Sequence, residues 1–247
     1  MKKIFLLTIY LFINFHFLAQ NSYWQQEIKY DIEVDFDHEI HQFNLSQEIT
    51  YTNNSPDDLN KVFFHLYYNA FQPGSMMDVR SRIIKDPDSR VGDRIHRLKP
   101  SEIGFQKIIS LKNEKGYDLK FNEQGTILEV FLEKPLRAGK KIKLSMLCHS
   151  QVPVQIRRTG RYNKENVAYS MTQWYPKMCE YDHEGWHSNP YIGREFHGVW
   201  GEFNVTINID SSFNLGGTGI IQNPNEVGFG YENEKFRTKK YFNNKLK

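Results

Sequence analysis

The feature that most restricts the fold of this chain is the strict alternation of apolar and polar residues over residues 29–51. In 29–37, the apolar positions share one face, and they are Tyr30, Ile32, Val34 and Phe36. In 43–51, the apolar face carries Phe43, Leu45, Ile49 and Tyr51. A period of two residues is typical of a strand with one buried face. Because the opposite faces are polar, we predict an antiparallel sheet with one side toward water.

The same analysis predicts strands through most of the remaining chain. They are expected at 61–68, 104–111, 117–121, 126–132, 140–148, 201–210, 215–221, 228–231 and 235–242. A helical period of useful length and an internal repeat are both lacking in the sequence. We therefore predict an all-β fold, with mostly antiparallel sheets in a saddle-like or sandwich arrangement.

Residues 72–104 interrupt this pattern with a charged, arginine-rich segment that contains several prolines. A loop of this length without secondary structure is unusual in a compact domain, so we predict an irregular insertion with some short helix. Five apolar residues are expected to anchor it, namely Ile83, Ile84, Val91, Ile95 and Leu98. Its arginines fit either a substrate-contacting loop or a salt-bridged surface, and the second interpretation is favoured for Arg80, Arg82, Arg90, Arg94 and Arg97.

The N-terminus has the pattern of a secretory signal peptide. Lys2 and Lys3 precede an apolar run over 4–17, which ends in Leu18-Ala19-Gln20. The run is shorter than the roughly 18 to 20 apolar residues that span a bilayer. We predict a signal peptide at 1–19 and a mature domain at 20–247, exported to the periplasm or the extracellular space. No membrane span is expected after cleavage.

Charge and cysteine content limit the partners and the crosslinks. The formal net charge of +3 is too small to favour nucleic acid as a partner. Export would permit a disulfide between the two cysteines, Cys148 and Cys179. Cys148 alternates with apolar residues, so we favour two free and buried thiols.

Residues 168–210 contain the clearest candidate for chemistry, His183-Glu184-Gly185-Trp186-His187, which matches the H-E-x-x-H pattern of zinc proteases. That pattern requires a helix, so that both imidazoles reach one Zn²⁺ and the Glu acts as general base. Here a glycine lies inside the motif and prolines flank it, and both disfavour a helix. The position where a third zinc ligand is common holds Thr206. We predict a loop between strands that does not form a zincin site.

Several segments in matching order carry a family resemblance. They are 30–36 (YDIEVDF), 64–71 (FHLYYNAF), 173–177 (QWYPK), 195–198 (EFHG) and 201–207 (GEFNVTI). The sequence resembles the N-terminal β-domain of the M1 family of zinc aminopeptidases, particularly the secreted bacterial branch.

The resemblance implies a saddle-shaped β-domain that packs on a thermolysin-like catalytic domain. In the family, the catalytic domain carries G-x-M-E-N and the zinc-binding H-E-x-x-H with a further Glu. The sequence lacks G-x-M-E-N, and its one H-E-x-x-H match is not in a helical context and has no further Glu at family spacing, so the chain is expected to be a non-catalytic domain or fragment whose catalytic partner is absent or separately encoded. Zinc would belong to that partner, and the chain alone is expected to show no peptidase activity and to hold no catalytic zinc.

The family's N-terminal domain also lends a glutamine to the amine of the peptide substrate, and Gln173 is the matching residue. An equally weighted interpretation makes Gln173 a strand-end side chain bonded to backbone. The acidic residues Glu180, Asp182 and Glu184 fit a solvated loop face better than an amine-binding site. Two other hypotheses remain open, a self-contained zinc hydrolase using His183, His187 and Glu184, and an exported β-scaffold or binding protein.

Overall fold

The computed structural model describes residues 23–86, 88–193, 196–224 and 245–246. The predicted signal peptide and the predicted strands at 228–231 and 235–242 lie outside these residues. In the described part, no helix is long and apolar enough to cross a membrane.

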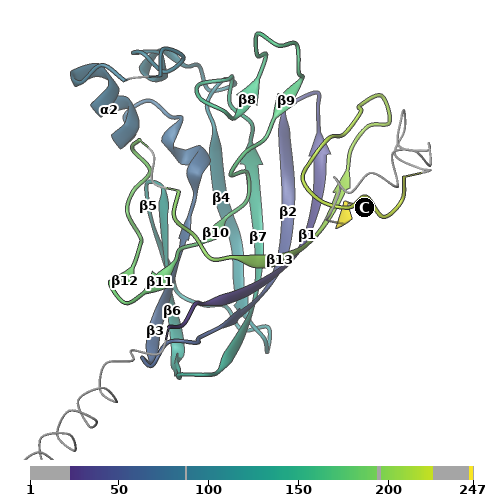
Figure 1. Cartoon of the computed structure of the whole chain (residues 1–247). Coiled ribbons are helices and arrows are strands. Elements are labelled where there is room, and N and C mark those ends of the chain that lie inside the picture. Colours follow the sequence, from purple (N-terminus) through teal and green to yellow (C-terminus); the bar gives the residue numbers. More distant parts are fainter. Residues whose placement is uncertain (1–22, 87, 194–195, 225–244, 247) are drawn as a thin grey trace, which may run out of the picture.

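The larger sheet has six strands in the order β14-β13-β1-β2-β7-β4 (Figure 1). Their bounds are β1 Glu27–Asp37, β2 Gln42–Thr52, β4 Phe105–Asn113, β7 Lys141–Gln151, β13 Gly201–Asn208 and β14 Lys245–Leu246. The pairs β1–β2, β2–β7 and β4–β7 are antiparallel, whereas β13 runs parallel to β1 and to β14. Gly201 allows the close approach at β1, because a Cβ there would lie 2.5 Å from the carbonyl oxygen of Ile28.

The predicted alternation sets which face of this sheet is buried. Tyr30, Ile32 and Val34 are at most 3% exposed, and Phe36 packs against the same core. The apolar residues predicted for β2 are all buried, as is Gln47 between them. The Gln47 amide donates to the carbonyl oxygen of Pro176 at 3.2 Å, which gives this buried polar group a partner. The sequence prediction for the first two strands is confirmed.

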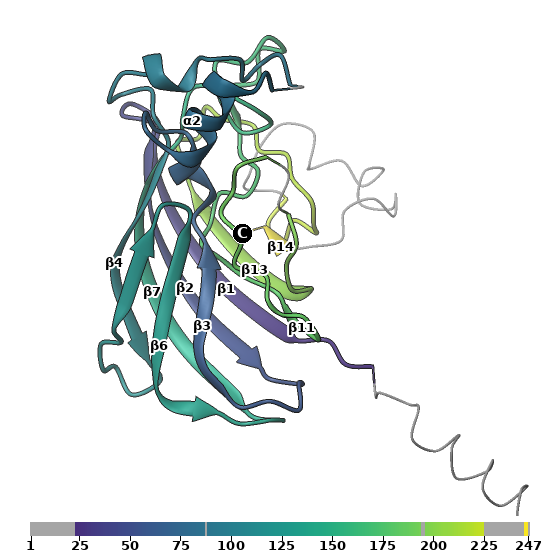
Figure 2. The ribbon, with the colours of Figure 1, turned by 90° about the vertical axis from the view of Figure 1, so that its left-hand side faces the viewer.

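The smaller sheet has the order β10-β3-β6-β5. Its strands are β3 Leu59–His65, β5 Phe121–Gln124, β6 Ile127–Leu136 and β10 Lys177–Met178. The strands of the two sheets lie side by side in Figure 2. The sheets share one hydrophobic core, in which Val62 and Phe64 of β3 are fully buried. Strand β3 pairs on both edges, with β10 and with β6.

The insertion forms short helices at one end of the sheets (Figures 1 and 2). They are α2 Met76–Ile83 and η2 Ile95–Arg97, and they follow η1 Tyr67–Ala70. The hydroxyl of Ser75 caps α2 by accepting from the Asp78 N–H. Val91 and Ile95 are fully buried and Leu98 is partly buried, as expected.

Two of the five predicted anchors of the insertion are wrong. Ile83 is 77% exposed and Ile84 is 56% exposed, whereas Met77 of the same helix is buried. The helical twist points Met77 toward the core, and the end of α2 projects into solvent.

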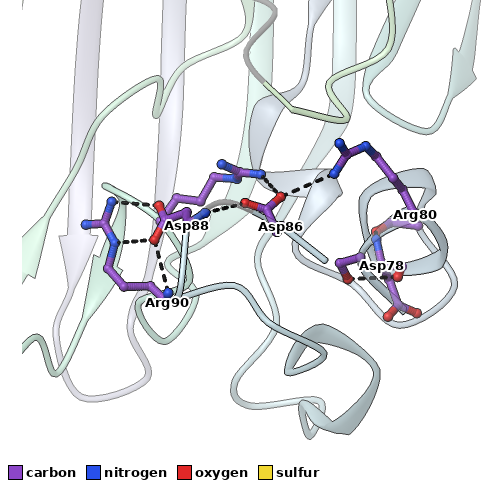
Figure 3. A network of polar contacts seen from close by, with 8 residues as sticks. Asp78, Arg80, Asp86, Asp88 and Arg90 are labelled. Carbon is purple, nitrogen blue, oxygen red and sulfur yellow. Dashed lines mark hydrogen bonds and ion pairs between the residues drawn. The ribbon is translucent and has the colours of Figure 1, made fainter. Parts of the chain in front are cut away.

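The arginines of the insertion form ion pairs with nearby aspartates (Figure 3). Asp86 accepts from Arg157 at 2.6 Å and lies 3.5 Å from Arg80, although its own side chain is almost fully buried. Local pairs join Arg82 to Asp78, Arg90 to Asp88 and Arg97 to Asp93. The salt-bridged interpretation of the insertion is therefore confirmed for these residues.

The fold class is confirmed as mostly β, with several mostly antiparallel sheets and one irregular insertion. Both cysteines are free and buried, and burial raises the pKa of the Cys148 thiol to about 12. The segment 215–221, predicted as a strand, forms no strand element in the structure. Its three glycines offer no side chains to pack on a sheet, which disfavours a strand.

Candidate functional site

Residues 153–200 join the two sheets through very short strands. These are β8 Gly160–Arg161, β9 Tyr169–Ser170, β11 Tyr181–Asp182 and β12 Gly185–Trp186, in addition to β10. Aromatic side chains, including those of Trp174 and Tyr175, attach the segment to the core. Tyr175 packs edge-on against Tyr30 of β1, and Trp174 packs edge-on against Phe43 of β2.

A large cleft of about 1690 Å³ runs between this segment and the β1–β13 side of the larger sheet. Its lining is rich in aromatic and aliphatic side chains, including Trp24, Trp174, Tyr175, Trp200, Phe203 and Val205. The Lys177 amine and the Glu180, Asp182 and His197 side chains add charged and polar groups at one part of the lining. The indole of Trp200 is 83% exposed.

The H-E-x-x-H letters fall on a hairpin and not on a helix. Strands β11 and β12 pair Tyr181 with Trp186 and Asp182 with Gly185, and His183-Glu184 form the turn between them. Gly185 has a φ of +96°, a conformation that other residues rarely adopt. The prediction of a loop between strands is confirmed, and His183 and Glu184 lie exposed at its tip.

The hairpin separates its side chains onto two faces. Paired residues of an antiparallel hairpin share a face, so Tyr181 and Trp186 point the same way. The Trp186 ring stacks on Tyr51 and contacts Phe63, which defines this face as the core side. Asp182 alternates with Tyr181 along β11 and therefore lies on the opposite face, as does His187 beyond Trp186.

His197 reaches the same place from another segment. An isolated bridge pairs Cys179 with Gly198, which brings the neighbouring His197 alongside Glu180. On the other side, the His187 N–H donates to the Glu180 carbonyl oxygen at 2.9 Å. The two imidazoles consequently meet, with ring centroids 4.5 Å apart and planes at 80°.

Asp182 lies between these two imidazoles. Its Oδ2 is 2.8 Å from His187 Nε2 and 3.6 Å from His197 Nε2. The contact with His187 is at ion-pair distance. It does not have the geometry of a hydrogen bond, and His187 Nε2 is buried and makes none. The donor atoms of Asp182, His187 and His197 all lie within 4.8 Å of one another. Among the described residues, this is the group that could hold a metal ion.

The electrostatics follow from this crowding. Burial opposes ionisation of Asp182, but His187, the Glu184 N–H and nearby imidazoles together hold the pKa of its carboxyl below the usual value. Burial raises the pKa of the Glu180 carboxyl, and the neighbouring His197 partly offsets that rise. The acidic residues of the hairpin thus differ in setting, since Asp182 contacts imidazoles whereas Glu184 is exposed.

The sequence analysis singled out His187 but did not connect it with Asp182 or His197. The sequence did contain a hint that Asp182 and His187 lie close together, since Gly185 between them favours a tight turn. The register between 179 and 198 could not be deduced from sequence, and this register brings His197 into the group.

Gln173, the predicted contact to a substrate amine, is half-buried and does not line the large cleft. It has a φ of +53°, which is uncommon for a residue other than glycine. The adjacent Trp174 does line the cleft, and its carbonyl oxygen accepts from the Gln106 amide at 2.9 Å. The structure thus places Gln173 beside a residue of the cleft wall but not in the lining itself.

Comparison with known proteins gives structural matches only. No protein-family profile matches the sequence, and no curated protein does. Among solved structures, the chain is similar to the M1 zinc metallopeptidase of Deinococcus radiodurans, with 13% identity, a TM-score of 0.35, and coverage of 60% of this chain and 26% of that one. A variant of that enzyme bound to a Tyr-Ser-Ala substrate gives 15% identity, a TM-score of 0.36, and coverage of 73% and 31%.

A two-domain M1 zinc metallopeptidase variant bound to L-tryptophan matches with 12% identity and a TM-score of 0.36, over 75% of this chain and 32% of that one. The chain thus spans about a third or less of the length of the enzymes that it matches. These enzymes belong to the family that the sequence motifs resemble.

Proposed function

We propose that this chain is the non-catalytic N-terminal β-domain, or a fragment, of an exported M1-type zinc metallo-aminopeptidase. In this role, it packs against a catalytic domain and helps to shape the channel for peptide N-termini. The motif resemblance suggests the role, and the apolar cleft beside β1 and β13 is the observation that carries it. Large exposed apolar surfaces mark interaction sites, and Trp200 and Val205 line this one.

The proposal assigns no chemistry to the chain itself. Peptide hydrolysis by a metalloprotease requires a metal-activated water, a general base and a pocket for the scissile bond. On the β11–β12 hairpin, Glu184 lies at an exposed turn and not over a pair of helical imidazoles. This geometry does not support the hypothesis of a self-contained zinc hydrolase. Zinc and the general base would come from the catalytic partner.

The decisive experiment reconstitutes the two parts. The genomic region after the Lys247 codon is expected to encode a protein with H-E-x-x-H and a further Glu ligand. The chain alone should not hydrolyse an amino-acid p-nitroanilide, and it should form a 1:1 complex with that second protein in size-exclusion chromatography. A region without such a reading frame, or a catalytic protein that does not bind, would contradict the proposal.

A matched pair of variants tests the docking face. Trp200→Glu places a charge on an exposed cleft residue and should weaken the complex by at least about 10-fold, because a buried charge without a partner is costly. Tyr117→Glu changes a residue that is 63% exposed and does not line the cleft, so it should bind normally. Equal affinity of the two variants would exclude the cleft as the docking face.

We also propose Gln173 as the residue that contacts the substrate amine. Its left-handed backbone conformation supports this assignment, because such strain clusters at functional positions. In the reconstituted enzyme, Gln173→Ala should raise KM more than it lowers kcat, since it removes a contact to bound substrate. Unchanged KM would leave Gln173 a structural residue.

A further inference from the structure

The group formed by Asp182, His187 and His197 has the composition of a transition-metal site. Two imidazole nitrogens and one carboxylate oxygen suit Zn²⁺, whereas Mg²⁺ and Ca²⁺ prefer oxygen ligands alone. Catalytic-type zinc sites also use three protein ligands and leave a fourth position for water. Asp182 and His197 lie at the polar end of the cleft lining, and no residue of a catalytic domain is needed to complete the cluster.

The distances are close to those of a coordinated ion. With metal–ligand bonds of 2.0 to 2.1 Å, tetrahedral geometry separates the ligand atoms by about 3.3 Å. The carboxylate oxygen Oδ2 of Asp182 is 2.8 Å from one Nε2 and 3.6 Å from the other, values on either side of this separation. The two imidazole ligand atoms are at most 4.8 Å apart, so side-chain rotations that bring them closer would place all three atoms around one ion.

The surroundings hold the ligands in place. The Asp182 Oδ1 accepts from the Glu184 N–H at 2.8 Å, so the carboxylate is oriented with Oδ2 toward the imidazoles. Such hydrogen bonds to ligating carboxylates are a regular part of metal sites. The His187 backbone is fixed by its bond to Glu180, and His187 Nε2 lies 2.8 Å from Asp182 Oδ2 without forming an aligned hydrogen bond. A metal ion between these two atoms would give the buried nitrogen a well-aligned partner.

The proposed metal position is open to solvent from the cleft side. His187 is 21% exposed at its side chain and His197 is 58% exposed. Asp182 and His197 line the cleft, so the fourth coordination position would face it.

We propose that Asp182, His187 and His197 bind one Zn²⁺ ion, with water as the fourth ligand, and that the ion fastens the β11–β12 hairpin to residues 196–199. This proposal departs from our sequence-based expectation that the chain holds no metal. That expectation considered His183 and His187 together with a third ligand at family spacing. The structure instead leaves His183 at the exposed turn and supplies Asp182 and His197.

The test measures zinc binding to the whole chain, prepared without a polyhistidine tag because such a tag would bind the ion itself. Metal is removed with a chelator, and ZnCl₂ is titrated by calorimetry. We expect one equivalent of zinc to bind. In addition, Co²⁺ should give the visible absorption spectrum of a four-coordinate site.

Matched variants locate the ligands. His187→Gln and His197→Gln should each weaken binding at least about 10-fold, which is the smaller loss seen when even an outer partner of a metal ligand is removed. His183→Gln and His149→Gln should leave the affinity within about 2-fold. His149 is a suitable control because it is exposed and bonded to Asn44, in another part of the chain.

Circular dichroism and thermal unfolding in the absence of metal verify that each variant is folded. Added ZnCl₂ should raise the Tm of the natural chain and of His183→Gln, but not that of His197→Gln, since only a ligand of the folded state stabilises it. Failure of the natural chain to bind one equivalent would overturn the proposal. Equal losses in His183→Gln and His197→Gln would also overturn it. None of these results bears on whether the chain docks to a catalytic domain.

Discussion

The larger sheet and the segment 153–200 are two parts of one core that are built in different ways. In β1, β2 and β7, each of eleven residues, alternating side chains bury one face, and backbone hydrogen bonds run along the full strands. In 153–200, the strands are two residues long, and side chains connect them to the rest. The stability of the sheet therefore comes mainly from packing of its buried face, whereas the position of the segment depends on a few specific side-chain contacts.

The largest effect is expected where both regions meet a single core residue. Phe43 is 1% exposed, and its ring contacts Tyr68 and Trp174. Phe43→Ala should lower the free energy of unfolding by about 3 to 5 kcal/mol, through lost burial and the cavity that remains. Urea unfolding measures this loss. Leu147→Ala, a 48% exposed residue of β7, should cost less than about 1 kcal/mol. Similar losses in both would contradict a packing-dominated sheet.

A slightly smaller effect is expected at Asp86, which connects the insertion to the segment. Asp86→Ala removes the partner of Arg157, whose side chain is only 10% exposed, and leaves a buried charge uncompensated. Breaking such a pair should cost about 3 kcal/mol in unfolding free energy. Asp93→Ala breaks a solvent-exposed pair with Arg97 and should cost less than about 1 kcal/mol. If the two variants unfold at the same urea concentration, the Asp86–Arg157 pair does not stabilise the contact between the insertion and the segment 153–200.

A single hydrogen bond joins the centre of the sheet to β10. The Met178 N–H donates to the Tyr30 hydroxyl at 2.8 Å, and both residues are buried. Tyr30→Phe leaves this N–H without a partner, which should cost about 1 to 2 kcal/mol. Hydrogen exchange at the Met178 amide should accelerate more than exchange within β2. Unchanged exchange at Met178 would show that the segment is held without this bond.

The smallest effect concerns His41, where the turn after β1 meets β8 and β9. Partial burial, Arg161 and His38 lower the pKa of His41 below its usual 6.5. The Tyr169 hydroxyl lies 2.6 Å from its Nδ1. The folded state thus favours neutral His41, so its contribution is present above pH 6.5 and is lost as pH falls through the lowered pKa. NMR titration should show a His41 pKa below 6.5, and Arg161→Gln should raise that pKa because it removes a nearby positive charge. A His41 pKa above 6.5 would refute the assignment.

The sequence alone predicted the strands of the larger sheet other than β14, favoured a salt-bridged insertion and indicated the non-helical nature of residues 183–187. These features are local: a period of two indicates which face is buried, and Gly185 disfavours a helix.

Only the tertiary structure decided which distant residues meet. The parallel pairing of β13 with β1, the outward end of α2 at Ile83 and the approach of His197 to Asp182 have no counterpart in local periodicity. Contacts of this kind depend on register between segments far apart in the chain, and register is set by packing of the whole core. The sequence analysis rejected the H-E-x-x-H letters as a zincin site and could not foresee that the hairpin and the 179–198 bridge bring Asp182 and His197 to His187.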